Sequence, residues 1–450
     1  MPQETSGPTA RVAERVINTC FEDLSMEAVT VTKQCLMDFI GVALAGTQQP
    51  LAGILLKEVE EQGGHPQASM FRTGRKANLS QAALFNGTAG HALDYDDVNG
   101  ACNGHPTVPV APAVLALAEH NESPGRDVVR ALACGIDAEC LVVSYTGRSP
   151  YRRGWHSTGT VGCFGATAAS AQLLGLDAAT TAQAFGIAGT QAGGLKAVFG
   201  TMNKPLHAGH AAATGIVAAS LAKRGYSSRS NILEAAQGFG ATQSEEVSPE
   251  QFERDIEAVD SFVPDTNYKY HAAGYLVHSA IEAARALQAD HDLDVDDIDS
   301  IEIKVDSGHF TTVNIPAPST GLEAKFSLRF AVAMALHGVD TARIESFNDD
   351  IVKDPALIET RDKAHVVAFD EPAADTRVTI ATTDGRTVSL EENVAIPERD
   401  LDLQWRKLEA KFHSLVDPLL GSDVADELIA WCRDLDNRED LDEFWDLLRG

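Results

Sequence analysis

The sequence predicts a mainly α protein, in which a large all-helical domain carries an inserted, smaller α+β domain. Three observations support this fold class. Up to about residue 240, apolar residues recur at helical spacing in alanine-rich segments that are broken by glycine, proline or asparagine. Strand-like alternation begins only after that region, at Ile298–Val305. Helical spacing returns near the C-terminus, so we expect the chain to re-enter the first domain.

The helical domain is predicted to comprise residues 1–268 and, after the insertion, residues 395–450. Because a 450-residue chain exceeds the usual size of about 100–200 residues for one domain, a second domain is expected. The predicted helices of the first part are Met26–Ala45, Leu79–Leu93, Pro109–Glu119, Asp127–Tyr145, Thr158–Leu174, Ala178–Phe199 and Leu206–Arg224. Those of the C-terminal part are Leu401–Val416, Ser422–Cys432 and Leu441–Leu448.

Residues 269–394 are predicted to form the α+β domain. Ile298–Val305 alternates apolar and polar residues, as a half-buried strand does. Thr376–Ala381 and Thr387–Leu390 flank Asp384-Gly385, a dipeptide typical of a tight hairpin turn. The predicted helices of this domain are Lys325–Leu336 and Pro355–Ala364, with a further helix ending near Leu287.

Acidic residues outnumber basic ones along much of the chain. Lys and Arg number 36 and Asp and Glu number 65, which gives a formal net charge of −29. Because nucleic acids and anionic membranes bind basic surfaces, this charge disfavours both as partners. An acidic surface also keeps a protein soluble in high salt, which suggests a halophilic source; an ordinary acidic protein is the alternative.

The N-terminus and the cysteines suggest the compartment. No basic segment followed by an apolar run opens the chain, and no stretch reaches the roughly 18 apolar residues of a membrane span, so we expect a soluble, cytoplasmic protein. The seven cysteines are scattered and mostly lie in apolar helical surroundings, as reduced core residues do. No C-x-x-C occurs, so cysteine spacing predicts neither a structural zinc site nor an iron–sulfur cluster.

The densest group of polar side chains lies where one predicted helix ends and the next begins. His91, Asp94, Asp96 and Asp97 are followed by His105 in a glycine-containing loop. If the loop is partly buried, three carboxylates this close cannot all ionise freely, so at least one should have a raised pKa and could act as a general acid or base. Alternatively, the aspartates cap a turn and His105 fills a corner.

A metal site is a further alternative for this segment. His91, Asp94, Asp97 and His105 offer credible ligand atoms, but no H-E-x-x-H or comparable spacing accompanies them. We therefore predict no metal. A glycine-rich phosphate loop is also absent from the sequence, so no nucleotide cofactor is predicted.

Two short segments place cations and hydrogen-bond donors just before predicted helices. They contain His156 and Lys204. A helix N-terminus offers free N–H groups and partial positive charge, so both residues would lie where a carboxylate is well received. A solvated surface position is the alternative for Lys204. His278 lies early on an apolar helix, where a buried core histidine is the alternative to a functional one.

These segments, in their order and spacing over about residues 10–415, resemble the signatures of the MmgE/PrpD family. The matching segments are Ala92–Asp97 with Gly104–Pro106, Gly154–Thr160, Lys204–Gly209, Lys269 with His278, and Ala324–Phe330. The resemblance implies a helical body with an inserted α+β lid, a homodimer, and an active site that uses no metal or organic cofactor.

The resemblance also implies a reaction class. The family includes 2-methylcitrate dehydratase, cis-aconitate decarboxylase and iminodisuccinate epimerase, so we expect a lyase for a small anionic di- or tricarboxylate, foremost a dehydratase of the 2-methylcitrate type used in propionate metabolism. An epimerase and a degenerate, non-catalytic binding protein are the alternatives. By resemblance, the catalytic residues are Asp94, His105, Lys204 and His278, and the substrate-binding residues are His156 and Lys269.

Two positions depart from the decarboxylase pattern. Val98 follows the acidic pair where the decarboxylase and dehydratase branches usually have threonine, and Phe330 stands where the decarboxylase branch has a tyrosine. Each change removes a hydroxyl that could bind substrate. Decarboxylation of cis-aconitate is therefore disfavoured.

Overall fold

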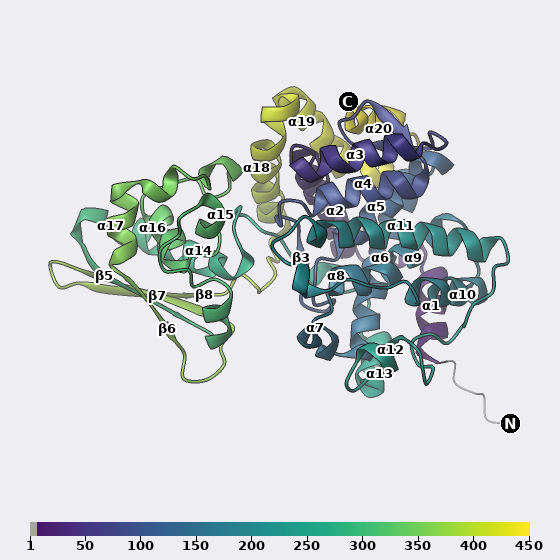
Figure 1. Cartoon of the computed structure of the whole chain (residues 1–450), viewed down its shortest axis with the longest axis horizontal. Helices are drawn as coiled ribbons and strands as arrows, with labels where there is room; N and C mark the ends of the chain where they lie inside the picture. The colour runs from purple at the N-terminus through teal and green to yellow at the C-terminus, as the bar shows by residue number, and fades with distance from the viewer. Residues whose placement is uncertain (1–6) are drawn as a thin grey trace. The chain divides into compact units, whose positions relative to one another are not determined.

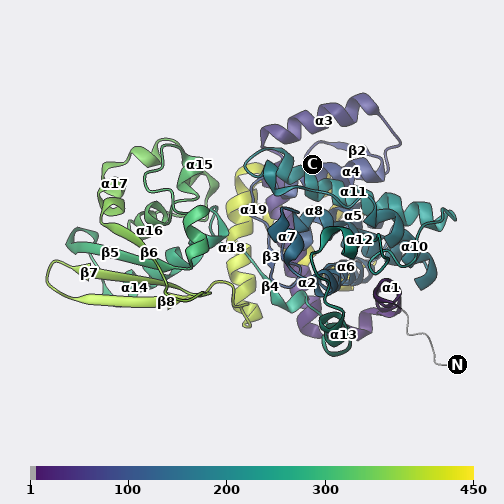
Figure 2. The same ribbon diagram turned by 60° about the horizontal axis from the view of Figure 1, so that its bottom comes forward.

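The computed structural model describes residues 7–450 and divides the chain into two compact units. The first unit is helical and includes the chain up to Tyr268 and again from Arg399 to the C-terminus, whereas the second is the segment Lys269–Glu398. Figures 1 and 2 show the elements of each unit. The predicted fold class, mainly α with a smaller α+β part, is confirmed.

Long helices make up most of the first unit, and short strand pairs join them. Its N-terminal helices are α1 (Pro8–Asn18), α2 (Met26–Gly46), α3 (Pro50–Gln62), α4 (Leu79–Gly90), α5 (Thr107–Asn121), α6 (Gly125–Thr146), α7 (Ser149–Arg153), α8 (Ser157–Thr160), α9 (Gly162–Leu173), α10 (Ala178–Gly189), α11 (Asn203–Lys223), α12 (Phe239–Gln243) and α13 (Pro249–Ala258). The C-terminal helices are α18 (Leu401–Leu420), α19 (Ser422–Arg433) and α20 (Asp442–Arg449). The antiparallel strand pairs are β1 (Ala68–Met70) with β2 (Arg75–Ala77), and β3 (Val98–Asn99) with β4 (Thr266–Asn267).

The second unit is a four-stranded sheet with the order β6-β5-β7-β8 and helices packed against it. The strands are β5 (Ile298–Val305), β6 (Ala364–Ala368), β7 (Thr376–Thr382) and β8 (Thr387–Glu392), and the helices are α14 (His278–His291), α15 (Gly321–Ala324), α16 (Leu328–Leu336) and α17 (Pro355–Asp362). Only the β5–β6 pair is parallel. Buried and less buried residues alternate along β7, because one face of the sheet meets the helices, as Figure 1 shows.

Side-chain caps explain why several helices begin where the sequence predicts. Ser25, Asn78 and Asp177 each accept a hydrogen bond from the backbone N–H three residues further on. Such a cap satisfies one of the N–H groups that the first helical turn leaves without a partner. The predicted starts of α2, α4 and α10 are thereby confirmed.

The packing of α4 against α11 depends on glycine. A Cβ built on Gly209 would lie 2.2 Å from the carbonyl oxygen of Leu84 and 2.4 Å from Oγ1 of Thr88, and a Cβ on Gly87 would lie 2.8 Å from Cα of Gly209. Only hydrogen at these positions lets the two backbones approach so closely. The contact also positions two polar residues, because His91 follows the C-terminal end of α4 and Lys204 lies at the N-terminal end of α11.

Several predicted boundaries were wrong. Helix α10 ends at Gly189 instead of continuing to Phe199, and α11 begins at Asn203 instead of Leu206. The segment predicted as one helix over Thr158–Leu174 is divided between α8 and α9. Strand β6 follows α17 directly and was missed, because its five residues give too short a pattern to separate from the helix before it.

Helix α2 corrects the expectation that no segment is apolar enough to cross a membrane. Among the described residues, it passes that test by length and composition, with a mean hydropathy of 1.4 over 18 residues. However, 89% of this window is buried inside the protein, as in the core helix of a folded domain. The expectation counted apolar residues alone and so overlooked a window that also contains a few polar ones, such as Lys33 and Gln34.

Candidate active site

The loop between α4 and α5 brings its polar side chains together through tight backbone turns. His91 caps the C-terminal end of α4, and the backbone N–H of Asp94 donates to the carbonyl oxygen of His91 at 3.2 Å. Asp94 has φ +51, in the left-handed region that aspartate tolerates better than most residues. Asn99 and Gly104 then exchange backbone hydrogen bonds of 3.0 and 3.4 Å, which close the loop just before His105.

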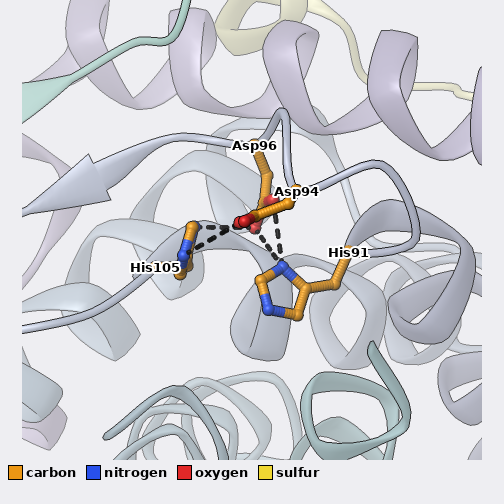
Figure 3. A group of neighbouring side chains, drawn as sticks. All are labelled: His91, Asp94, Asp96 and His105. Carbon is orange, nitrogen blue, oxygen red and sulfur yellow. Dashed lines mark hydrogen bonds and ion pairs between the residues drawn. The ribbon is translucent and has the colours of Figure 1, made fainter. Parts of the chain in front are cut away.

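Figure 3 shows the carboxylates of Asp94 and Asp96 grouped with the imidazole rings of His91 and His105. Nδ1 of His91 lies 3.0 and 2.9 Å from the two carboxylate oxygens of Asp96. Nδ1 of His105 lies 3.1 Å from Oδ2 of Asp96, and its Nε2 lies 3.5 Å from Oδ1 of Asp94. The Asp94 oxygen also receives the ammonium group of Lys204 at 2.8 Å.

The electrostatics of the cluster favour ionised Asp96 and neutral His91. Burial would raise the pKa of Asp96, but His105 and His91 outweigh it and hold that pKa well below its ordinary value. Burial lowers the pKa of His91 to about 4, despite the opposing effect of Asp96. At neutral pH the site therefore contains a carboxylate, an uncharged imidazole and the ammonium group of Lys204.

Asp97 faces away from these histidines. Its carboxyl group accepts hydrogen bonds from the hydroxyl of Thr107 at 2.5 Å and from the backbone N–H of Thr107 at 3.3 Å. Burial, with the charge of Asp38 adding to it, raises the pKa of Asp97 to about 8. The predicted raised pKa in this run is thus confirmed, but at Asp97, which lies against Thr107 instead of the histidines.

His156 lies beside the cluster and is held by aromatic neighbours. Its ring stacks on His91 with centroids 5.7 Å apart, and its Nδ1 lies 3.1 Å from Nδ1 of His207. Burial lowers the pKa of His156, and His91 and Lys204 lower it further, so this ring is neutral too. His156 is the N-cap residue of α8, so its predicted position just before a helix is confirmed. Because α8 has only four residues, its dipole is small.

Of the remaining predicted site residues, Lys204 belongs to the helical unit and the other two to the second unit. Lys204 lies in the first turn of α11 instead of before the helix, and its side chain is 14% exposed, so the surface alternative is wrong. Lys269 and His278 lie in the second unit and are both buried. Nε2 of His278 lies 3.2 Å from the carbonyl oxygen of Ala273, to which it can donate. The structure thus brings Asp94, His105 and Lys204 together, with His156 adjacent, and the roles of Lys269 and His278 stay predictions.

Two contributors were not foreseen from the sequence. Asp96 was grouped with its neighbours, but its position between two histidines has no spacing signal, because it depends on the turn at Asp94. His207 was quoted only as part of a motif, although it is the partner of His156. Its position one helical turn after Lys204 on α11 was the available signal.

The donor set could hold a divalent metal ion. His91, Asp94, Asp96 and His105 each offer a ligand atom within 4.8 Å of the others, so Asp96 replaces the predicted Asp97 in this group. The ammonium group of Lys204 on Asp94 would repel a cation placed there. That positive charge, beside neutral imidazoles, suits a carboxylate ligand better than a metal.

The Phe330 argument against decarboxylation is weakened by the structure. This side chain is fully buried in the described chain, so it offers no surface to a substrate. Val98 is partly exposed in β3, directly after Asp97. Val98 departs from the dehydratase branch as well as from the decarboxylase branch, so it does not separate the two reactions.

Comparison with known proteins adds independent information. The MmgE/PrpD N-terminal domain matches residues 10–251 and the MmgE/PrpD C-terminal domain matches residues 271–437. The chain is 27% identical over 450 residues to cis-aconitate decarboxylase of Mus musculus, which covers 93% of this chain and 88% of that protein. It is 27% identical over 453 residues to the Homo sapiens enzyme of that name, covering 95% and 91%. A cis-aconitate decarboxylase-like protein, oryM, of Aspergillus oryzae is 27% identical over 482 residues, covering 99% and 98%.

Proposed function

The chain belongs to the MmgE/PrpD family, and from this premise we propose that it is a metal-independent lyase for a small di- or tricarboxylate. The proposed reaction is dehydration of a 2-methylcitrate-like substrate. The observation that carries the proposal is the juxtaposition of the Lys204 ammonium, the Asp94 carboxylate and His105.

The first chemical step in this proposal is removal of a proton from the carbon next to a substrate carboxylate. The pKa of such a proton is high because the carbanion-like product adds negative charge to an existing anion. A nearby ammonium group stabilises that charge, and Lys204 supplies it in a half-buried setting where charges interact strongly. The base then passes a proton to the hydroxyl on the adjacent carbon, which leaves as water. The electron pair of the broken carbon–hydrogen bond forms the carbon–carbon double bond.

The neutral histidines of the site favour a reaction that begins with proton removal by a base. His91 and His156 are uncharged at neutral pH because burial lowers the pKa of each. Uncharged imidazole accepts protons, whereas an acid-first reaction needs imidazolium. His105 is the imidazole that lies against both Asp94 and Asp96, and on this geometry we assign it the role of base.

Decarboxylation of cis-aconitate is the second candidate. It is favoured by the names of the relatives, which match over nearly the whole chain. Val98 does not separate it from dehydration, because both branches usually have threonine at this position. Both reactions need the same cation for a polycarboxylate, so the products must decide between them.

The deciding experiment is an assay of purified protein against 2-methylcitrate, cis-aconitate and iminodisuccinate in D₂O, followed by ¹H NMR and ultraviolet absorbance. Dehydration gives a new absorbing enoate with no loss of carbon. Release of CO₂ from cis-aconitate would replace the first candidate by the second. Exchange of substrate hydrogen for deuterium without a new double bond would identify an epimerase. Lack of turnover with any of them would favour a non-catalytic binding protein.

Metal independence is tested in the same assay. Activity should survive exhaustive chelation, because the proposed charge stabilisation comes from Lys204 rather than from a Lewis acid. Loss of activity with EDTA and its recovery with a divalent ion would instead make His91, Asp94, Asp96 and His105 metal ligands.

A further inference from the structure

Asp96 is the centre of a three-residue chain of contacts. Its carboxylate meets Nδ1 of His91 on one side and Nδ1 of His105, at 3.1 Å, on the other. It is 1% exposed, so water does not compete for these contacts. We propose that Asp96 is a positioning residue that keeps the proton of His105 on Nδ1, so that Nε2 retains the lone pair that accepts the substrate proton.

The choice of tautomer follows from donor and acceptor rules. A neutral imidazole carries one N–H, and an ionised carboxylate can only accept. Whichever nitrogen faces the carboxylate more closely therefore carries the proton. For His105 that nitrogen is Nδ1, because Nε2 is 3.5 Å from Asp94, an oxygen that already receives the Lys204 ammonium.

The contact between His105 and Asp96 has ion-pair distance but is not aligned as a hydrogen bond. Catalytic hydrogen bonds are often misaligned in a site without substrate and tighten when it binds. In the proposal, substrate binding aligns the Nδ1–H of His105 with the carboxylate of Asp96. The same alignment sets the direction of Nε2, so position and tautomer are controlled together.

His91 supports this arrangement from the opposite side. Its Nδ1 contacts both oxygens of Asp96, and its Nε2 is buried with no hydrogen-bond partner among residues 7–450. Because burial keeps His91 neutral, its single proton lies on Nδ1 and is donated to Asp96. His91 thus orients the carboxylate without cancelling its charge, which stays available to His105.

The catalytic consequence rests on the proposed function, but the tautomer does not. The first test is therefore ¹⁵N NMR of the histidine-labelled wild-type protein, with the His105 signals assigned by their loss in His105→Asn. We expect a protonated Nδ1 and an unprotonated Nε2. A proton on Nε2 in the wild type overturns the proposal, whatever the substrate is.

The second test uses Asp96→Asn, with Asp97→Asn as the matched control. The amide of the first variant can donate to Nδ1, so the His105 proton should move to Nε2 and kcat should fall by about 10²–10⁴-fold with KM little changed. Asp97→Asn alters the neighbouring buried carboxyl, which faces Thr107, and should leave the tautomer and kcat close to wild type.

Other outcomes contradict the proposal. An unchanged His105 tautomer in Asp96→Asn, or an equal loss of kcat in both variants, would mean that the loop needs its carboxyl groups only for shape. His91→Phe keeps a ring but loses the donor, so kcat should fall by about 10–100-fold while the His105 tautomer is retained. Full activity of His91→Phe would remove His91 from the chain of contacts.

Discussion

Replacement of Lys411 by methionine tests how the C-terminal helices support the site. Lys411 lies on α18 and is 3% exposed. Its ammonium group donates to the carboxylate of Asp38 on α2 at 2.5 Å and to the backbone carbonyl oxygen of Tyr95 at 2.8 Å. It also lies 4.1 Å from the centre of the Tyr95 ring. Tyr95 lies between Asp94 and Asp96 in the chain. The side chain of Lys411 therefore holds the backbone of the loop that carries both of these carboxylates.

The expected cost follows from what the substitution leaves behind. Methionine keeps most of the length and volume of lysine, so packing changes little. Asp38, 4% exposed, would keep a buried charge without its ammonium partner, and breaking a buried pair in this way typically costs about 3–5 kcal/mol. The double variant Asp38→Asn with Lys411→Met removes the charge as well, and should recover about half of that loss.

Urea unfolding of the two variants and the wild type measures these free energies. The loss in Lys411→Met should shrink as the pH falls, because protonation of Asp38 removes the buried charge that has lost its ammonium partner. The double variant should show little pH dependence from this source. A loss below about 1 kcal/mol in the single variant, or a double variant that is less stable than the single one, would refute the reasoning.

Three further predictions concern single positions. Lys204→Ala should abolish turnover, and Lys204→Arg should retain little, because the planar guanidinium group of arginine rarely replaces a compact ammonium group. Lys223→Ala, on the same helix, is the control. Full activity in both Lys204 variants would exclude Lys204 from the mechanism. The pKa of Asp97 in the folded protein is about 8, above its ordinary value, so its stabilising effect is complete at low pH and is lost as the pH rises towards 8. In urea unfolding, Asp97→Asn should therefore gain about 3 kcal/mol of stability relative to wild type between pH 5 and 8. A difference that stays constant with pH would contradict the raised pKa. Gly209→Ala should destabilise the protein by about 3 kcal/mol, because its Cβ would lie 2.2 Å from a carbonyl oxygen of α4. Gly53→Ala, whose Cβ would have nothing within 4 Å, should stabilise the protein slightly. Equal effects of the two substitutions would refute the close approach of α11 to α4.

Much of the fold could be predicted because helices are local. Caps such as Ser25 and Asn78, together with apolar spacing, fix where α2 and α4 begin. Strand β6 was harder, since it pairs with β5, more than fifty residues earlier, and such pairing leaves no local pattern. The same reason explains why Lys411 was not foreseen: its partners lie more than three hundred residues away in the sequence.

The candidate site shows a sharper limit of sequence reasoning. Asp96 and Asp97 are neighbours and are each 1% exposed, so burial alone would raise the pKa of both. The pKa of Asp96 is nevertheless lowered, because two histidines face it, whereas that of Asp97 is raised by burial and by nearby Asp38, which outweigh the hydrogen bonds from Thr107. Asp96 contacts His91 and His105, whereas Asp97 contacts Thr107, so these adjacent residues meet different partners. The sequence could therefore predict that one carboxyl of the run is neutral, but only the turn at Asp94 decides which of them remains charged beside His105.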